Sequence, residues 1–164
     1  GGPCFLADAV ADPLTGIANR RVFLERLGIL AEDPSSRFAL LMLDLDDFKR
    51  INDEYGHLRG DEVLAQVARL LRDNIRESDR VARYGGEEFI VLMPQTSLTQ
   101  ATALADRLRA MVFEGTPASI SIGCAIRDPG ETAGSVLKRA DDLLLSAKRT
   151  GKNAVRSSTL RRSA

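Results

Sequence analysis

The feature that most constrains the fold is an unbroken apolar run from Phe38 to Leu43, which ends in Asp44-Leu45-Asp46-Asp47. A run without polar alternation is typical of a strand that is buried on both sides. It therefore predicts a strand inside the protein. It also places Asp44 on rigid backbone at the end of that strand, where a mobile loop could not hold a carboxylate as well.

A predicted hairpin surrounds the sequence Gly85-Gly86-Glu87-Glu88. The β-type run Asp79–Ala82 precedes it, and the apolar run Ile90–Met93 follows it. Two such runs joined through a pair of glycines predict a hairpin. The adjacent carboxylates of the two glutamates repel each other, and a hard cation such as Mg²⁺ would relieve that repulsion. The alternative interpretation is a solvated turn that carries two acids.

The remaining elements follow from the spacing of apolar residues. Helical spacing predicts helices over 20–31, 48–55, 61–75, 97–112 and 134–148, and further strands are expected at 118–126 and 154–156. Gly56 to Gly60 is expected to break the chain between two of the helices. This order fits an α+β fold, with an antiparallel central sheet flanked by helices on one face.

The composition excludes several classes of protein. The chain has 164 residues, enough for one domain, and its 23 basic residues balance its 23 acidic ones, so we expect no nucleic-acid partner. Cys4 and Cys124 form neither a metal pair nor a disulfide framework, which fits a reducing compartment. No apolar run approaches the roughly 18–20 residues that span a bilayer. We therefore expect a cytoplasmic domain without direct membrane contact, either free or at the cytoplasmic end of a membrane-bound sensor.

Three carboxylates are candidates for one metal site. If the hairpin strand pairs beside the Phe38–Leu43 run, Asp44 meets Glu87 and Glu88. Together with the backbone carbonyl of Leu45 they would make an all-oxygen site suited to Mg²⁺ or Mn²⁺. The alternative for Asp44 is a helix N-cap.

The residues after Asp44 are candidates for nucleotide binding. Lys49 and the first-turn amides of its helix would form a polyphosphate cradle beside a divalent metal. Asn52 lies on the same helix face, and Asn52 and Asp61 together match the edge of guanine, because a carboxylate accepts both the N1 and N2 hydrogens. The alternatives are a surface lysine, a helix-end asparagine and an N-cap aspartate.

Three further residues have open roles. His57 lies in a turn flanked by glycines, where a structural or ligand-adjacent role is favoured over acid–base catalysis. Lys148 and Lys152 are four residues apart at the end of the last helix, where they either reach phosphates or complement the helix dipole.

These motifs closely resemble the GGDEF domain of diguanylate cyclases over about residues 8–156. The resemblance is carried by several motifs in the right order: Asp12-Pro13-Leu14-Thr15-Gly16, Asn19-Arg20-Arg21, Asp44-Leu45-Asp46-Asp47-Phe48-Lys49, Asn52-Asp53, Tyr55-Gly56-His57, Gly60-Asp61, Arg83-Tyr84-Gly85-Gly86-Glu87-Glu88-Phe89, Ser121-Ile122-Gly123 and Ala147-Lys148 to Asn153. It divides the chain into a linker or the end of a signalling helix (1–11), the GGDEF domain (12–156) and a disordered tail (157–164).

The resemblance implies a fold like the palm of nucleotidyl cyclases and polymerases, and a reaction in which two GTP give cyclic di-GMP and two pyrophosphates. It implies two Mg²⁺ or Mn²⁺ ions per active site and a homodimer, because each domain holds one GTP. The implied metal ligands are Asp44, Leu45, Glu87 and Glu88. The implied catalytic residues are Glu87, Glu88 and Lys49. The implied substrate-binding residues are Phe48, Asn52, His57, Asp61, Gly85, Gly86, Lys148 and Lys152.

The resemblance also implies regulation. Arg76-Glu77-Ser78-Asp79 is similar to the R-x-x-D product site of the family, and Arg107 falls where a second product-binding arginine is often found. Bound cyclic di-GMP would then inhibit the enzyme, and the alternative is a charged helix end. An upstream sensory or receiver domain, absent from the sequence here, is expected to control dimerisation.

Two departures and two alternatives accompany the resemblance. Lys152 stands where many members have arginine, and the connection from Phe113 to Ala118 is shorter than is typical. The main alternative function is a catalytically idle domain that acts as a GTP or cyclic di-GMP receptor or scaffold. A cyclase that accepts ATP is disfavoured by Asp61.

Overall fold

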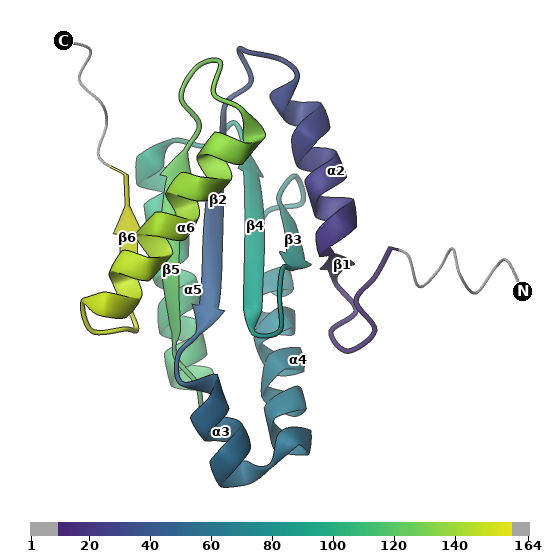
Figure 1. The fold of residues 1–164 in the computed structure, drawn as a ribbon, viewed down its shortest axis with the longest axis vertical. Coiled ribbons are helices and arrows are strands. Elements are labelled where there is room, and N and C mark those ends of the chain that lie inside the picture. Colours follow the sequence, from purple (N-terminus) through teal and green to yellow (C-terminus); the bar gives the residue numbers. More distant parts are fainter. Residues whose placement is uncertain (1–9, 159–164) are drawn as a thin grey trace, which may run out of the picture.

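The structure, a computed structural model, describes residues 10–158, which form a six-stranded sheet and five helices (Figure 1). In chain order the elements are β1 (Ala18–Asn19), α2 (Arg20–Ala31), β2 (Phe38–Leu45), α3 (Phe48–Tyr55), α4 (His57–Asp73), β3 (Arg80–Arg83), β4 (Glu88–Pro94), α5 (Leu98–Gly115), β5 (Ile120–Ile126), α6 (Ala133–Arg149) and β6 (Val155–Ser157).

The sheet is mixed, with the strand order β1-β3-β4-β2-β5-β6. Its centre is antiparallel as predicted, since β2 pairs antiparallel with both β4 and β5, and β3 with β4. The two outer pairs, β1 with β3 and β5 with β6, are parallel. The α+β class and the antiparallel centre of the sheet are confirmed, and the parallel edge pairs make the sheet as a whole mixed. Parallel neighbours require a long crossover, and α6 supplies it between β5 and β6.

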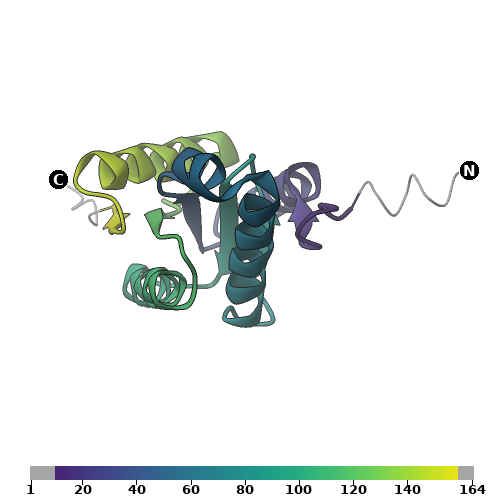
Figure 2. The ribbon, with the colours of Figure 1, turned by 90° about the horizontal axis from the view of Figure 1, so that it is seen from below.

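Helices cover both faces of the sheet, and not one face as predicted. Figure 2 shows α2 and α6 on one side and α4 and α5 on the other. The side chains of β2 explain this arrangement, because Leu41 and Leu43 belong to the core under α4 and α5, whereas Leu40 and Met42 belong to the core under α2 and α6. An apolar strand of this kind needs a covering layer on each face.

The helix boundaries confirm some capping predictions and correct others. The Asn19 side chain accepts a hydrogen bond from the Val22 amide (3.0 Å), so it caps α2 as predicted. Asp44 lies within β2, so it is not an N-cap. Asp61 is not an N-cap either, because α4 begins at His57 and residues 57–60 are helical. Gly56, with a φ of 87°, makes the break between α3 and α4 by itself.

The backbone of α6 lies directly on β5 at Gly123. A Cβ atom at this position would lie 2.1 Å from the carbonyl oxygen of Ala140 and 2.4 Å from the amide nitrogen of Leu144. Only glycine therefore permits this approach. Lys148 follows Leu144 by one helical turn, so the close packing brings the end of α6 to the end of β2.

Residues at both ends of the described range are hydrogen-bonded to the rest of the fold. The backbone amide of Asn19 donates to the carbonyl oxygen of Val10 (3.1 Å), and the backbone amide of Ser158 donates to the carbonyl oxygen of Cys124 (3.1 Å). The rest of the predicted linker and tail, with Cys4, lies outside the described residues. Cys124 is a free thiol, and its burial raises its pKa to about 11. None of the helices within residues 10–158 combines the length and the apolar character that crossing a membrane requires.

Candidate active site

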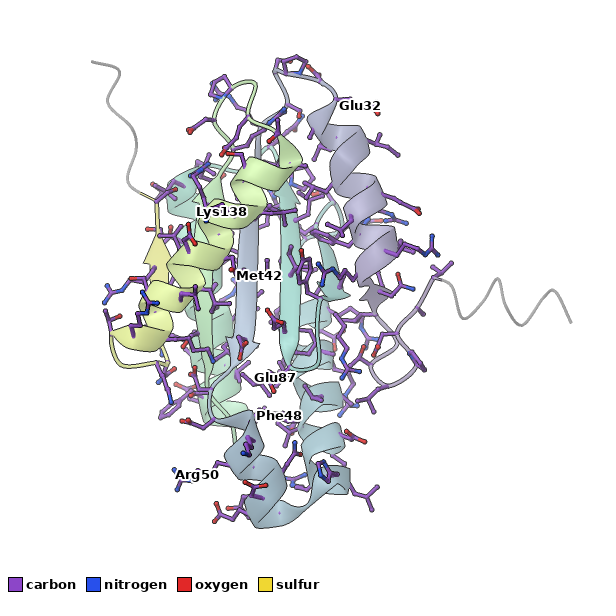
Figure 3. The ribbon with its side chains drawn as sticks, viewed as in Figure 1. Glu32, Met42, Phe48, Arg50, Glu87 and Lys138 are labelled. Carbon is purple, nitrogen blue, oxygen red and sulfur yellow. The ribbon has the colours of Figure 1, made fainter. Side chains whose placement is uncertain are left out.

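The backbone brings the predicted acidic residues together at one end of the sheet. Asp44 pairs with Glu88 across β2 and β4, and the amide of Leu45 donates to the carbonyl of Glu87 (3.1 Å). Figure 3 shows Glu87 at this end of β4, close to Phe48 at the start of α3. The predicted pairing of the hairpin strand beside the apolar strand is therefore observed.

These carboxylates share a strongly negative environment. Burial, and then the charge of Asp44, raise the pKa values of Glu87 and Glu88. Burial also raises the pKa of Asp44, even though the Lys148 ammonium opposes this effect. In the side-chain conformations of residues 10–158, no three carboxylates, imidazoles or thiols converge closely enough to hold a metal. The Lys148 ammonium instead brings a positive charge close to Asp44 and Glu87 and opposes the rise of their pKa values.

The Lys148 ammonium binds two of the predicted metal ligands. Its Nζ atom donates to Asp44 Oδ1 (2.9 Å) and to the carbonyl oxygen of Leu45 (3.0 Å). Two oxygen atoms from successive residues of β2 thus already hold a positive charge. The donor set, with Glu87 and Glu88 beside it, fits a hard cation such as Mg²⁺.

Asp46 also belongs to this site, a role that was not predicted from the sequence. Its carboxylate accepts hydrogen bonds from Lys148 Nζ (2.9 Å), Ser119 Oγ (2.7 Å), Ser121 Oγ (2.6 Å) and the Asn153 amide (2.9 Å). Burial disfavours its charge, but these hydrogen bonds outweigh burial and lower its pKa. A pattern in the sequence could have indicated this role, because Ser119 and Ser121 alternate along the predicted strand and therefore place both hydroxyls on the same side of it.

The two glycines of the hairpin have different surroundings. A Cβ atom at Gly85 would lie 2.5 Å from Glu88 Oε1, whereas one at Gly86 would meet nothing within 4 Å. Gly85 therefore leaves room for the Glu88 carboxylate, and only Gly86 faces open space that a ligand could enter. The family resemblance implied a role in substrate binding for both glycines.

The predicted phosphate-binding lysines lie on the same side of the molecule but differ in their ion pairs. Lys49 is exposed in the first turn of α3 and makes no ion pair with any residue between 10 and 158. Lys152 pairs with Asp47 (2.6 Å), and both residues have positive φ angles of 61° and 53°. Lys148 contacts carboxylates, as described above, and not a free anion-binding space.

The predicted guanine-reading residues lie at the junction of α3 and α4. Asn52 Oδ1 is buried, and it has no hydrogen-bond partner among the described residues. A Cβ atom at Gly60 would lie 1.8 Å from this oxygen and 3.2 Å from Phe48 Cζ, so the three residues touch. An unsatisfied buried acceptor is costly, which marks it as a group that awaits a donor. Asp61 and His57 lie nearby in chain order, exposed in the first two turns of α4.

The predicted product site is a separate surface feature. Arg76 donates to Asp79 from its backbone amide (2.9 Å) and from its guanidinium Nη2 (3.0 Å), and the Asp79 side chain is fully buried. The hydrogen bond to Asp79, and to a smaller extent the charge of Asp79, raise the pKa of Arg76. Arg107 donates to the carbonyl of Asn74 (3.2 Å). A pocket of about 630 Å³ joins Arg76 and Arg107 to Thr96 and Gln100.

The sequence profile of the family described as diguanylate cyclase, GGDEF domain, matches residues 9–154. The chain belongs to this GGDEF family. Its motif reads Gly-Gly-Glu-Glu-Phe at positions 85–89, which form the turn between β3 and β4 and the start of β4. The palm-like α+β fold expected from the resemblance is confirmed.

Known proteins show the same relationship. The diguanylate cyclase DgcP of Pseudomonas aeruginosa is 43% identical over 159 residues, which cover 88% of this chain and 23% of that protein. The response regulator PleD of Caulobacter vibrioides is 43% identical over 165 residues, which cover 90% of this chain and 36% of PleD. The chain therefore spans about a quarter to a third of the length of these relatives.

A solved structure of a GGDEF domain has the same fold. The crystal structure of the coiled coil and GGDEF domain of DgcB from Caulobacter crescentus, in complex with c-di-GMP, matches with a TM-score of 0.90 and 31% identity. The match covers 95% of this GGDEF chain and 89% of that chain.

Proposed function

We propose that this GGDEF domain is a diguanylate cyclase, which condenses two GTP into cyclic di-GMP and two pyrophosphates. The observation that carries the proposal is the position of Asp44, Glu87 and Glu88 at the same end of the paired strands β2 and β4, where Asp44 already binds the Lys148 ammonium. The family membership supports the choice of reaction.

The Asp44 carboxylate, the Leu45 carbonyl and the two glutamates would hold Mg²⁺ or Mn²⁺. Bound divalent ions would supply the charge that activates the 3′-hydroxyl and stabilises the triphosphate. Glu87 and Glu88 have raised pKa values, which suits a carboxylate that accepts the proton of that hydroxyl. Lys49 and Lys152 flank the start of α3, where they would meet the phosphates.

Base selection would occur at the junction of α3 and α4. The unpartnered Asn52 Oδ1 would accept a hydrogen bond from guanine, and Asp61 would accept two more. Phe48 and Gly60 shape the space beside Asn52, and His57 would lie next to the bound base. Gly86 provides open backbone past which the nucleotide would enter.

We further propose that turnover requires a homodimer. The acidic cluster, Lys49 and Asn52 make one nucleotide site per domain. Two nucleotides must react with each other, so a second copy of the domain would have to face the first. A GTP substrate would suit a cytoplasmic domain.

Product inhibition would act through the pocket between Arg76 and Arg107. The neighbour DgcB was crystallised with c-di-GMP, and two arginines beside one pocket suit its phosphates. Arg107→Ala is the variant that tests binding at this site without removing the partner of a buried charge. Arg76→Ala would also leave the buried Asp79 carboxylate unpaired and so confound binding with folding. We expect Arg107→Ala to raise the product concentration needed for inhibition, whereas unchanged inhibition would argue against the site.

The deciding experiment for the reaction is an assay of the domain fused to a dimerising coiled coil, with GTP and Mg²⁺. We expect cyclic di-GMP from the wild type, none from Glu88→Gln and a relaxed preference for GTP over ATP in Asp61→Ser. GTP binding without any product would instead support the catalytically idle receptor. Unchanged GTP preference in Asp61→Ser would refute the role of that residue.

A further inference from the structure

Asp46 is the most deeply buried acid at the end of β2. Its side chain is 2% exposed, against 20% for Asp44. The two serine hydroxyls and the Asn153 amide fix its carboxylate from three sides, and the fourth donor is Lys148. Its position therefore does not depend on the lysine alone.

Lys148 is shared between this fixed carboxylate and the candidate metal ligands. Its Nζ atom lies 2.9 Å from Asp46 Oδ1 and 2.9 Å from Asp44 Oδ1. Within residues 10–158, the Asp44 carboxylate accepts a hydrogen bond from Lys148 alone. The bond to Asp44 can thus be exchanged for another cation without breaking any other contact of Asp44, whereas Asp46 is bound into the protein.

We propose that Asp46 is a positioning residue that keeps the Lys148 ammonium beside the candidate metal site, where the ammonium neutralises Asp44 in the metal-free protein and withdraws to Asp46 when a divalent ion binds. The inference rests on the proposed function, because it requires a divalent ion at Asp44 and the Leu45 carbonyl.

Two physical costs set the direction of this exchange. An ammonium and a divalent cation repel each other, so they cannot share Asp44 Oδ1 and the Leu45 carbonyl at hydrogen-bond distance. A buried carboxylate that loses its only charged partner is strongly destabilising, so the bond between Lys148 and Asp46 is the one that is kept. Lys148 then stays at the edge of the site, as a cation available to the phosphates.

The first test follows the Lys148 side chain directly by NMR of its ¹⁵Nζ and ¹³Cε nuclei. We expect a slowly exchanging, hydrogen-bonded ammonium in the metal-free wild type, and a shift of its resonance on addition of Mg²⁺. In Asp46→Asn the slow exchange should be lost with or without Mg²⁺. Ser119→Ala is the matched control, because it removes one hydrogen bond to Asp46 and leaves Lys148 in place. Slow exchange that survives in Asp46→Asn would overturn the proposal.

The second test measures Mn²⁺ affinity by electron paramagnetic resonance, with Mn²⁺ alone as the probe. Lys148→Met should tighten binding by about tenfold, because one competing charge is removed a few ångström from the ion. Lys152→Met is the control, because it removes the same charge from a lysine that pairs with Asp47 and not with Asp44.

The outcomes separate this inference from the function on which it rests. Equal effects of the two lysine variants on Mn²⁺ affinity, in a protein that binds Mn²⁺ and makes cyclic di-GMP, would overturn the inference and leave the cyclase proposal standing. A protein that binds no Mn²⁺, even with GTP, would overturn both.

Discussion

Arg83 joins Asp12, 71 positions earlier in the chain, to the glycine turn of the active site. Its Nη1 atom donates to Asp12 Oδ1 (3.2 Å), and its Nη2 atom donates to the carbonyl oxygen of Gly86 (2.7 Å). Burial opposes the charge of Asp12, but hydrogen bonds from Thr15 and the guanidinium of Arg83 outweigh it and lower the pKa of Asp12. The segment before the first strand thus contacts the turn through one guanidinium.

We expect Arg83→Met to loosen the turn and to lower the free energy of unfolding by about 1–3 kcal/mol, because Asp12 and the turn carbonyls lose a charged donor. Urea titration measures the loss, and hydrogen exchange at the Gly85 and Gly86 amides measures the loosening. Lys138→Met, which breaks an exposed pair with Asp142, serves as the control and should change stability little. Equal losses in the two variants would contradict a special role for Arg83.

Neutralising Glu88 should stabilise the metal-free protein in a pH-dependent way. Burial and the charge of Asp44 raise the pKa of Glu88 above its ordinary value of 4.5, so ionisation costs more in the folded state than in the unfolded state. This penalty is absent below the unfolded pKa and grows as the pH rises through the folded pKa. Glu88→Gln should therefore be more stable than the wild type at pH 7 and equal to it at pH 3.

The measurement is urea unfolding at both pH values in the presence of a chelator. The control is Glu114→Gln, which neutralises an exposed glutamate. Addition of Mg²⁺ should reverse the order, because the wild type gains more than the variant from a bound cation. A variant that is less stable than the wild type at pH 7 without metal would show that Glu88 has a structural role.

The buried Oδ1 atom of Asn52 should cost stability in return for nucleotide binding. Asn52→Leu keeps the branched shape of the side chain and removes a buried oxygen that has no partner among residues 10–158, so the free energy of unfolding should rise by about 1 kcal/mol. GTP binding, measured by calorimetry, should be lost. The matched control is Asn74→Leu, because the Asn74 amide donates to the carbonyl of Leu70 (2.8 Å), so its replacement should not stabilise the protein.

The two glycines of the turn should respond differently to alanine. In Gly85→Ala the new methyl group displaces the Glu88 carboxylate, so kcat and Mn²⁺ affinity should both fall. In Gly86→Ala the methyl group enters open space, so metal affinity should persist while KM for GTP rises. Steady-state kinetics with Mn²⁺ titration distinguishes the two. Identical kinetic effects would show that the turn acts as one unit.

The sequence predicted the central strand and its acidic end well, because an apolar run and a glycine pair are local signals. The parallel edge pairs were missed, since β1 has only two residues and its partner β3 lies about 60 residues later. The second helical layer was missed as well, although a strand without polar alternation implies one on each face.

The acidic residues of the site were predicted, but the hydrogen bonds that connect them through Lys148 were not. The contacts of Lys148 with Asp44 and Asp46 join residues about 100 positions apart, and no local pattern carries that information. The space that Gly85 leaves for Glu88 depends on the geometry of a turn, for which the residue types alone leave several conformations open.

Gly123 gives the domain a way to adjust its chemistry from a distance. Because the α6 backbone contacts β5 at Gly123, the absence of a side chain there sets how far Lys148 extends past the sheet. Any larger residue there would lift the helix and retract the ammonium from Asp44 while leaving every active-site residue unchanged. Relatives of this domain could therefore differ in their demand for divalent metal through a single substitution in the hydrophobic interior, one that a comparison of active-site motifs alone would overlook.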